Sequence, residues 1–270
     1  MPALDSAFTG SIPKLYDSLM VPMIFETYAD DLVERLAGLR LGRVLEVAAG
    51  TGVVTRALAD ALPASVGIVA TDLNPAMLEQ ARQLRSMRPV QWQQADALSL
   101  PFPDATFDAV VCQFGAMFFP DKALAFAQAR RVLKPGGIFL FNVWDRIAEN
   151  EFAETVGEAL ALVFPDDPPR FMERIPHGYY ERAQIERDLS DAGFSAPIGF
   201  ATVTARSRAP SARSAAIAYC QGTPLRSEIE ARDPARLGAA TDAAETAIAA
   251  RFGPGPLDGK IQAHVVWVER

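Results

Sequence analysis

Cysteine and histidine are scarce in this 270-residue chain, which has only Cys112, Cys220, His177 and His264. Two distant cysteines build neither a disulfide framework nor a zinc site. No cluster of His, Asp and Glu has metal-ligand spacing either, so we expect no metal. Free thiols are typical of a reducing compartment, and the N-terminus lacks the basic start and apolar run of a signal peptide. These absences predict a cytoplasmic protein.

An excess of positive charge and a long apolar run are also missing. The formal net charge is -7, whereas nucleic-acid binding needs a cationic footprint, so we expect no nucleic-acid partner. No segment approaches the roughly 18 consecutive apolar residues of a membrane span. The partner class that remains is a small molecule, and the oligomeric state stays open between monomer and homodimer.

Strand-like and helix-like segments alternate through residues 43–145. The apolar segments "RVLEVAAG", "VGIVATD", "PVQWQQAD", "TFDAVVCQF" and "IFLFNVW" are typical of strands, and helical spacing separates most of them. "KPGG" before the last of them is typical of a turn. This alternation predicts an α/β fold, a Rossmann-like doubly wound parallel sheet. Ligands in such sheets bind beyond the carboxyl ends of the strands.

The rest of the chain is expected to complete and cover this sheet. Residues 1–40 predict an N-terminal helical lid, with helices broken near Pro22, and residues 41–145 form the ligand-binding core. Residues 146–270 are expected to supply the remaining strands with helical cap insertions, within the same domain. Two late segments, "SAPIGFATVTARS" and "GKIQAHVVWVER", have the pattern of strands.

The first strand ends in an acid and a turn of small residues, "VLEVAAGTG". Gly50 and Gly52 allow the backbone to approach a ligand closely, and the next helix offers free N–H groups. A buried carboxylate at Glu46 needs a partner, and an ammonium group on a ligand is a natural one. The alternative is an ordinary strand-to-helix turn beside an unrelated acid.

Three nucleotide sites compete for this turn. The phosphate-binding sequence G-x-x-x-x-G-K-[ST] is absent, and G-x-G-x-x-G fails because Thr55 stands at its third glycine. S-adenosylmethionine, which has no phosphate, is the third possibility. Asp72, at the second strand end, suits the ribose of NAD and of S-adenosylmethionine alike, or caps the next helix. Asp96, after the third strand, suits an adenine amino group, or is an exposed loop residue.

The four strand-end motifs together resemble those of class I S-adenosylmethionine-dependent methyltransferases, especially the bacterial group around the ubiquinone/menaquinone C-methyltransferases. They are "VLEVAAGTG", "ATDLNPAMLEQAR", "QADALSLPFPDATFDAVVCQF" and "RVLKPGGIFLFNVW", in this order over roughly residues 40–145. The sequence departs from the family at Ala48, where glycine is usual. The resemblance implies a seven-stranded sheet with its last strand antiparallel.

The resemblance also implies a cofactor, S-adenosyl-L-methionine, with S-adenosyl-L-homocysteine as product. Glu46 would meet its methionine amino end, Asp72 its ribose, and Gln113 the methionine part near the active-site mouth. Leu73 would pack on the adenine, which Asp96 and Ala97 would recognise. The remaining residues expected to bind the cofactor are Ala48, Gly50, Thr51, Gly52 and Met77.

Residues on the acceptor side have no recognisable motif. Aromatic side chains near the N-terminus, after the fourth strand and beside His177 are candidates for an acceptor pocket, with packing in the core as the alternative: Tyr16, Tyr28, Phe114, Phe118 and Tyr179. His177 is the candidate catalytic base because histidine titrates near neutrality; the alternative is a loop histidine without chemistry.

The sequence therefore predicts methyl transfer to a small-molecule acceptor. Two alternatives stay open, an NAD-linked oxidoreductase and a non-catalytic S-adenosylmethionine-binding protein. The acceptor and the atom that is methylated are left undetermined, because methyl transfer depends mainly on positioning and a dry pocket.

Overall fold

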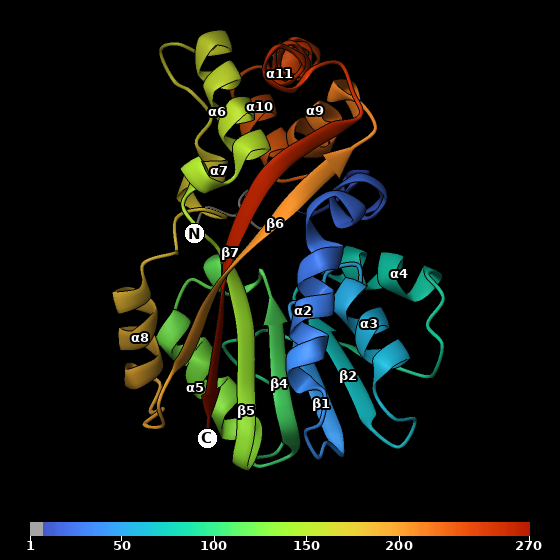
Figure 1. The fold of residues 1–270 in the computed structure, drawn as a ribbon, viewed down its shortest axis with the longest axis vertical. Coiled ribbons are helices and arrows are strands. Elements are labelled where there is room, and N and C mark those ends of the chain that lie inside the picture. The colour runs from blue at the N-terminus through green and yellow to red at the C-terminus, as the bar shows by residue number, and fades with distance from the viewer. Residues whose placement is uncertain (1–7) are drawn as a thin grey trace. The chain divides into compact units, whose positions relative to one another are not determined.

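A computed structural model describes residues 8–270, which divide into two compact units (Figure 1). The sheet unit comprises Glu26–Val143, Tyr179–Val203 and Ala263–Arg270. The helical unit comprises the described residues up to Phe25, together with Trp144–Gly178 and Thr204–Gln262. Both units are therefore assembled from segments that lie far apart in the sequence.

The sheet has seven strands in the order β3-β2-β1-β4-β5-β7-β6. Strands β1 to β5 pair in parallel. Strand β7 is antiparallel to β5, because the Gly136 amide donates to the Arg270 carbonyl and the Arg270 amide donates back to Gly137. The expected fold class is confirmed. The strands are β1 Arg43–Val47, β2 Gly67–Asp72, β3 Gln91–Gln94, β4 Phe107–Gln113, β5 Leu133–Trp144, β6 Gly199–Ala209 and β7 Leu257–Glu269.

Helices cover both faces of the sheet because neighbouring residues of a strand point to opposite faces. On one face Leu140 joins a buried cluster with Leu32 of α2 and Leu58 of α3. On the other face Phe139 and Phe141 pack against Phe126 of α5. The helices of this unit are α2 Glu26–Leu36, α3 Val53–Ala61, α4 Pro75–Gln83, η3 Ala116–Phe118, α5 Lys122–Val132 and α8 Arg182–Asp191.

The helical unit is built around α11, which packs against α6 and α9. Its apolar contacts include the edge-to-face pair of Phe152 and Phe252, with ring centroids 4.8 Å apart. The helices of this unit are α1 Ile12–Leu15, η2 Tyr16–Phe25, η4 Ile147–Glu149, α6 Glu151–Val163, α7 Phe171–Arg174, α9 Ala212–Gln221, α10 Leu225–Arg232, η5 Pro234–Arg236 and α11 Leu237–Phe252.

Two local expectations were wrong. The helices near the N-terminus are not broken at Pro22, which lies inside the π-helix η2 that leads directly into α2. A π-helical turn bonds residues five apart and is wider than an α-helical turn, so it relieves the clash between the proline ring and the carbonyl of the preceding turn. The sequence "KPGG" does not precede β5 but lies within it, as a bulge between the pairs Phe107–Leu133 and Ala109–Ile138.

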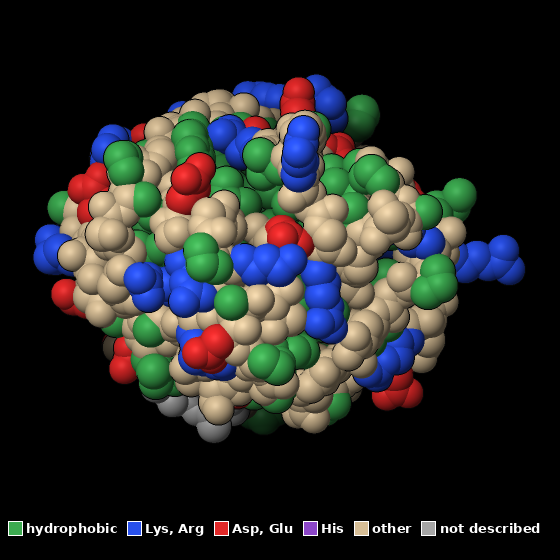
Figure 2. All heavy atoms as spheres, turned by 90° about the horizontal axis from the view of Figure 1, so that it is seen from below, with side chains coloured by type: hydrophobic (Ala, Val, Ile, Leu, Met, Phe, Trp, Pro, Cys, Tyr) green, Lys and Arg blue, Asp and Glu red, His purple; other side chains and the backbone are tan. Residues whose placement is uncertain are grey.

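The edge of the sheet where the parallel strands begin is rich in arginine and lysine, which Figure 2 shows across the face seen from below. Several of these cations are bound by the protein itself. Arg88 donates to the carbonyls of Pro63 and Val66, Arg131 to those of Leu100 and Phe102, and Lys134 to Asp108. Cations at helix ends and strand starts stabilise exposed carbonyl groups, so this charge has a structural role.

Candidate functional site

The turn after β1 takes a backbone conformation that favours glycine. Gly50 and Gly52 have φ angles of 57° and 84°, in the left-handed region that disfavours side chains. A Cβ atom on Gly52 would lie 2.7 Å from the Trp92 ring, which is too close for a real contact. Gly52 also begins helix α3, so the free N–H groups of that helix face the same turn.

Ala48 occupies the same left-handed region, with a φ angle of 56°. The family's usual glycine at this position therefore has a conformational reason, since alanine there costs on the order of 1 kcal/mol. A Cβ on Gly115, at the neighbouring end of β4, would collide with Ala48 and Cys112. The two loops thus touch, and Ala48 fits only because its partner has no side chain.

Glu46 is buried in β1, with 1% of its surface exposed. Its carboxyl group accepts a hydrogen bond from the Thr55 hydroxyl of α3, and the Thr71 hydroxyl donates to its backbone carbonyl at 2.9 Å. Burial raises the pKa of Glu46 to about 8, against the opposing effects of Thr55 and Arg56. The Thr55 that breaks the dinucleotide fingerprint is therefore the hydrogen-bond partner of this acid.

Asp72 ends β2 and ties the two strand-end loops together. Its Oδ2 accepts the Gly50 N–H at 2.8 Å, and its Oδ1 accepts the Asn74 N–H at 2.7 Å. Burial raises the pKa of Asp72, while these two backbone N–H groups act in the opposite direction. Each carboxylate oxygen has a second acceptor site, so the residue can bind a pair of ligand hydroxyls as well. The Asn74 side chain caps helix α4 instead of Asp72.

Residues that follow Asp72 offer an apolar surface. Leu73 is 55% exposed, so its side chain is accessible to a ligand ring. Met77 is buried and lies beside Gly50. After β3, Asp96 is exposed, and its Oδ1 accepts the Leu98 N–H at 2.9 Å, whereas Ala97 is buried. The Asp96 side chain thus stabilises the turn in which it lies, as expected for an exposed loop residue.

The end of β4 depends on a residue that sequence analysis missed, the fully buried Asn142 of β5. Its side-chain oxygen accepts the Phe114 N–H at 2.8 Å, and its amide nitrogen donates to the Gln113 side chain at 3.4 Å. Phe114 has a φ angle of 48°, so Asn142 holds a strained residue in place. A polar residue in the otherwise apolar "IFLFNVW" was the available signal.

The aromatic candidates have different environments. Tyr28 is fully buried, its hydroxyl donates to the Val203 carbonyl, and its ring meets Phe114 edge-to-face at 5.3 Å. The Tyr179 hydroxyl donates to Asp188 at 2.6 Å, and its ring lies 4.7 Å from the Lys122 ammonium. Phe118 is half-buried in η3. In the helical unit, Tyr16 stacks on Phe25 at 5.1 Å.

His177 is buried in the helical unit, and its Nδ1 lies 2.8 Å from the Asp145 carbonyl. A carbonyl only accepts, so Nδ1 carries the proton and Nε2 carries the lone pair. Burial lowers the pKa of His177 to about 4, against the effect of the Asp145 carbonyl. The imidazole is therefore neutral at physiological pH.

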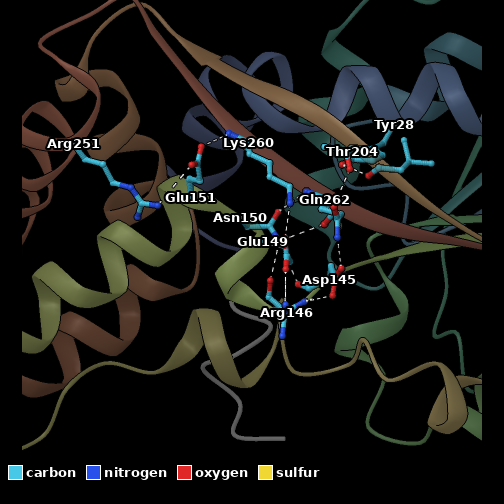
Figure 3. Close-up of polar contacts among 11 residues, drawn as sticks. Tyr28, Asp145, Arg146, Glu149, Asn150, Glu151, Thr204, Arg251, Lys260 and Gln262 are labelled. Atoms are coloured by element: carbon cyan, nitrogen blue, oxygen red, sulfur yellow. Dashed lines mark hydrogen bonds and ion pairs between the residues drawn. The ribbon is translucent and has the colours of Figure 1, made fainter.

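A network of polar side chains holds the Asp145 carbonyl in place (Figure 3). No sequence motif indicated this network. The buried Asn150 side chain donates to the carbonyls of Asp145, Arg146 and Gln262 and accepts the Gln262 N–H. The Gln262 side chain donates to Asp145 Oδ2 at 2.7 Å. Beside it, Lys260 pairs with Glu149. His177 thus bonds to a carbonyl that is held by a network with members from residues 145–150 and residues 260–262.

The residues at the carboxyl edge of the sheet fit S-adenosylmethionine. The Thr51 hydroxyl is buried without a hydrogen-bond partner in the described structure, which costs free energy unless a ligand satisfies it. The two hydroxyls of a ribose suit Asp72, an adenine suits the exposed Leu73, and an ammonium group suits Glu46. Among residues 8–270, no group of three His, Cys, Asp or Glu residues could hold a metal ion, and no helix is long and apolar enough to cross a membrane.

Comparisons with known proteins agree with this geometry. Residues 45–141 match the family model described as a methyltransferase domain. A demethylmenaquinone methyltransferase of Deinococcus radiodurans is 45% identical over 97 residues, which are 35% of this chain and 40% of that protein. An uncharacterized protein of Mycobacterium tuberculosis is 40% identical over 165 residues, 59% of this chain and 54% of that one. The chain spans about half the length of the curated relatives it matches.

A solved structure shows the same fold. It is a Bacillus halodurans protein assigned as a methyltransferase, with a TM-score of 0.57, 19% identity, and coverage of 89% of this chain and 97% of that one. At this identity the likeness concerns the fold, whereas the family match rests on the strand-end motifs. Residues 45–141 are therefore similar to a methyltransferase domain, and the strand-end motifs within them resemble those of class I S-adenosylmethionine-dependent methyltransferases.

Proposed function

We propose that this protein transfers a methyl group from S-adenosylmethionine to a small-molecule acceptor. The observation that carries the proposal is the convergence of Glu46, Asp72 and the Gly50–Gly52 turn, tied together by the hydrogen bond from Gly50 to Asp72 at 2.8 Å. The cofactor, when bound, supplies a methyl group on a positively charged sulfonium. The protein's contribution is to bind, orient and exclude water.

Each strand end has a part in this binding. Asp72 holds the ribose, Glu46 the amino end, and Leu73 with Met77, Asp96 and Ala97 the adenine. The N–H groups at the start of α3, with Ala48, Gly50, Thr51 and Gly52, allow a close approach of the ligand to the backbone. Gln113, fixed by Asn142, lies at the methionine end.

The acceptor is a separate question, because the family model covers residues 45–141 and includes no part of the helical unit. The name of the Deinococcus relative makes a demethylmenaquinone-like ring one acceptor to test. Phe118 of the sheet unit and Tyr16 of the helical unit are half-buried and have aromatic surface for an acceptor, whereas Tyr28 and Phe114 are buried and are weaker candidates. Tyr179 is a weaker candidate, since Asp188 occupies its hydroxyl.

His177 is proposed as an acceptor-side residue. With Nδ1 protonated, its Nε2 can accept a hydrogen bond from an acceptor hydroxyl or amine. Its low pKa makes it a weak base, so the proposed role is orientation with transient proton acceptance. The acidic charge favours a small molecule over nucleic acid, and two buried free thiols fit the reducing cytoplasm.

Calorimetric titration with S-adenosylhomocysteine, with NAD(H) in parallel, tests the cofactor. Labelled S-adenosylmethionine with a panel of small acceptors then tests transfer. We expect S-adenosylhomocysteine alone to bind, and label to appear in an acceptor. Binding of NAD(H) alone would establish the oxidoreductase instead. Binding of S-adenosylhomocysteine with no transfer to any acceptor in the panel would favour the non-catalytic binding protein.

A further inference from the structure

Glu46 is an acid placed in an apolar interior without a cation bound to it. No ion pair joins it to a Lys, Arg or His among residues 8–270, and the Thr55 hydroxyl is the partner of its carboxyl group. On the same face of β1, Val44 belongs to the buried apolar cluster of the sheet unit. An unpaired ionised carboxylate in such a place is strongly unfavourable, so the carboxyl group holds its proton when no ligand is bound.

The groups around Glu46 do not change this conclusion. Helix α3 supplies Arg56, whose guanidinium donates to the Thr51 carbonyl at 2.7 Å and acts on Glu46 only at a distance. Strand β2 supplies Asp72 and strand β4 supplies Cys112, and a negative charge at Asp72 further disfavours ionised Glu46. Helix α2 contributes apolar residues to the core on this side. The raised pKa of about 8 agrees with this arrangement.

We propose that Glu46, oriented by Thr55, recognises the amino group of the bound cofactor by giving up a proton to solvent. The proposal rests on the proposed function, because it takes the methionine end of the cofactor to lie at Glu46. In the free protein the group is a neutral carboxylic acid. In the complex it is a carboxylate paired with the ligand ammonium, and one proton has passed to the buffer.

This exchange makes Glu46 a determinant of ligand specificity. A ligand without the amino-acid end, such as 5′-methylthioadenosine, brings no ammonium group and leaves Glu46 protonated. Linkage then requires the affinity for S-adenosylhomocysteine to rise with pH while Glu46 is mostly protonated, by about tenfold per pH unit below its pKa. The affinity for 5′-methylthioadenosine stays constant, so the preference between the two ligands widens as pH rises.

The test is titration calorimetry with both ligands in phosphate and in imidazole, buffers with different enthalpies of protonation. At about pH 6.5 the linkage predicts release of nearly one proton per S-adenosylhomocysteine bound and none for 5′-methylthioadenosine. The ratio of the two affinities should rise about tenfold between about pH 6 and about pH 7. Glu46→Gln should abolish proton release and flatten the ratio. Asp72→Asn should weaken both ligands but keep the release.

Each result either supports or overturns the proposed proton release by Glu46. Binding of S-adenosylhomocysteine without proton exchange, or equal release by both ligands, overturns the proposal and leaves the proposed function standing. Failure of S-adenosylhomocysteine to bind at all overturns the proposed function as well. Binding of 5′-methylthioadenosine by Glu46→Gln shows that the variant is folded, so that loss of proton release in it is meaningful.

Discussion

The sheet unit and the helical unit hold their buried polar groups in different ways. In the sheet unit, Glu46 is bonded to Thr55, nine residues away, and Asp72 to Asn74 and Gly50, two and 22 residues away. In the helical unit, Asn150 is bonded to Gln262, 112 residues away. Hydrogen bonds between residues close in the sequence leave a recognisable motif, whereas hydrogen bonds between residues more than a hundred positions apart leave none. The part expected to bind the cofactor is for this reason recognisable, and the part expected to choose the acceptor is not.

The largest expected effect concerns the buried acid of the sheet unit. The unfolded chain ionises Glu46 above its ordinary pKa of 4.5, whereas the folded protein keeps the proton up to about 8. The free energy of unfolding is therefore lost as pH rises through this window, by on the order of 3–5 kcal/mol. Glu46→Gln should lack this loss, as measured by urea unfolding of the ligand-free protein at about pH 5 and about pH 8. Equal pH dependence in both proteins would mean that Glu46 is ionised in the fold.

The buried base of the helical unit should show the opposite pH dependence. The pKa of His177 is about 4 in the folded protein, against 6.5 ordinarily, so the unfolded state binds the proton first. Stability is then lost as pH falls from 6.5 to about 4, by about 3 kcal/mol. His177→Asn keeps a donor for the Asp145 carbonyl but cannot titrate, and should lack this loss in the same urea assay. If His177→Asn showed the same pH dependence as the wild type, titration of His177 would not be the cause of the stability lost at low pH.

A smaller effect should distinguish the edge where the parallel strands end from the edge where they begin. Asp72→Ala should weaken S-adenosylhomocysteine binding by about 1–3 kcal/mol, because ribose hydroxyls lose a charged partner. The matched control is Asp108→Ala, an acid that also accepts two backbone N–H groups, from Gly42 and Arg43, but lies at the start of β4. The control should lose stability and keep its affinity. Undiminished binding by Asp72→Ala, measured by calorimetry, would remove Asp72 from the site.

The smallest expected effect is a gain in the free energy of unfolding. Ala48→Gly should raise the free energy of unfolding by about 1 kcal/mol, less the entropy that glycine adds to the unfolded chain, because it relieves a left-handed alanine. Ala57→Gly, inside helix α3, is the control and should lower stability by roughly the same amount. Urea midpoints measure both changes. A destabilised Ala48→Gly would show that the methyl group contributes more by packing than its conformation costs.

Prediction from the sequence was most successful where the chain turns locally. The strand-end positions of Glu46, Asp72 and Gln113 followed from apolar segments that end in polar residues, and the structure places all three at strand ends. Asn142 was missed because its partners, Gln113 and Phe114, belong to another strand. Pro22 misled because a π-helix, which tolerates it, has no clear sequence signature.

The sequence by itself determined the alternation of strands and helices, the turn of small residues after β1 and the class of cofactor, since each depends on residues close together in the chain. Only the tertiary structure decided the protonation of Glu46 and His177, the partners of Asn142 and Asn150, and the division into two units. The physical reason is burial. The sequence specifies a carboxyl or imidazole group but not its surroundings. The charge of that group depends on whether distant segments of the chain bury it.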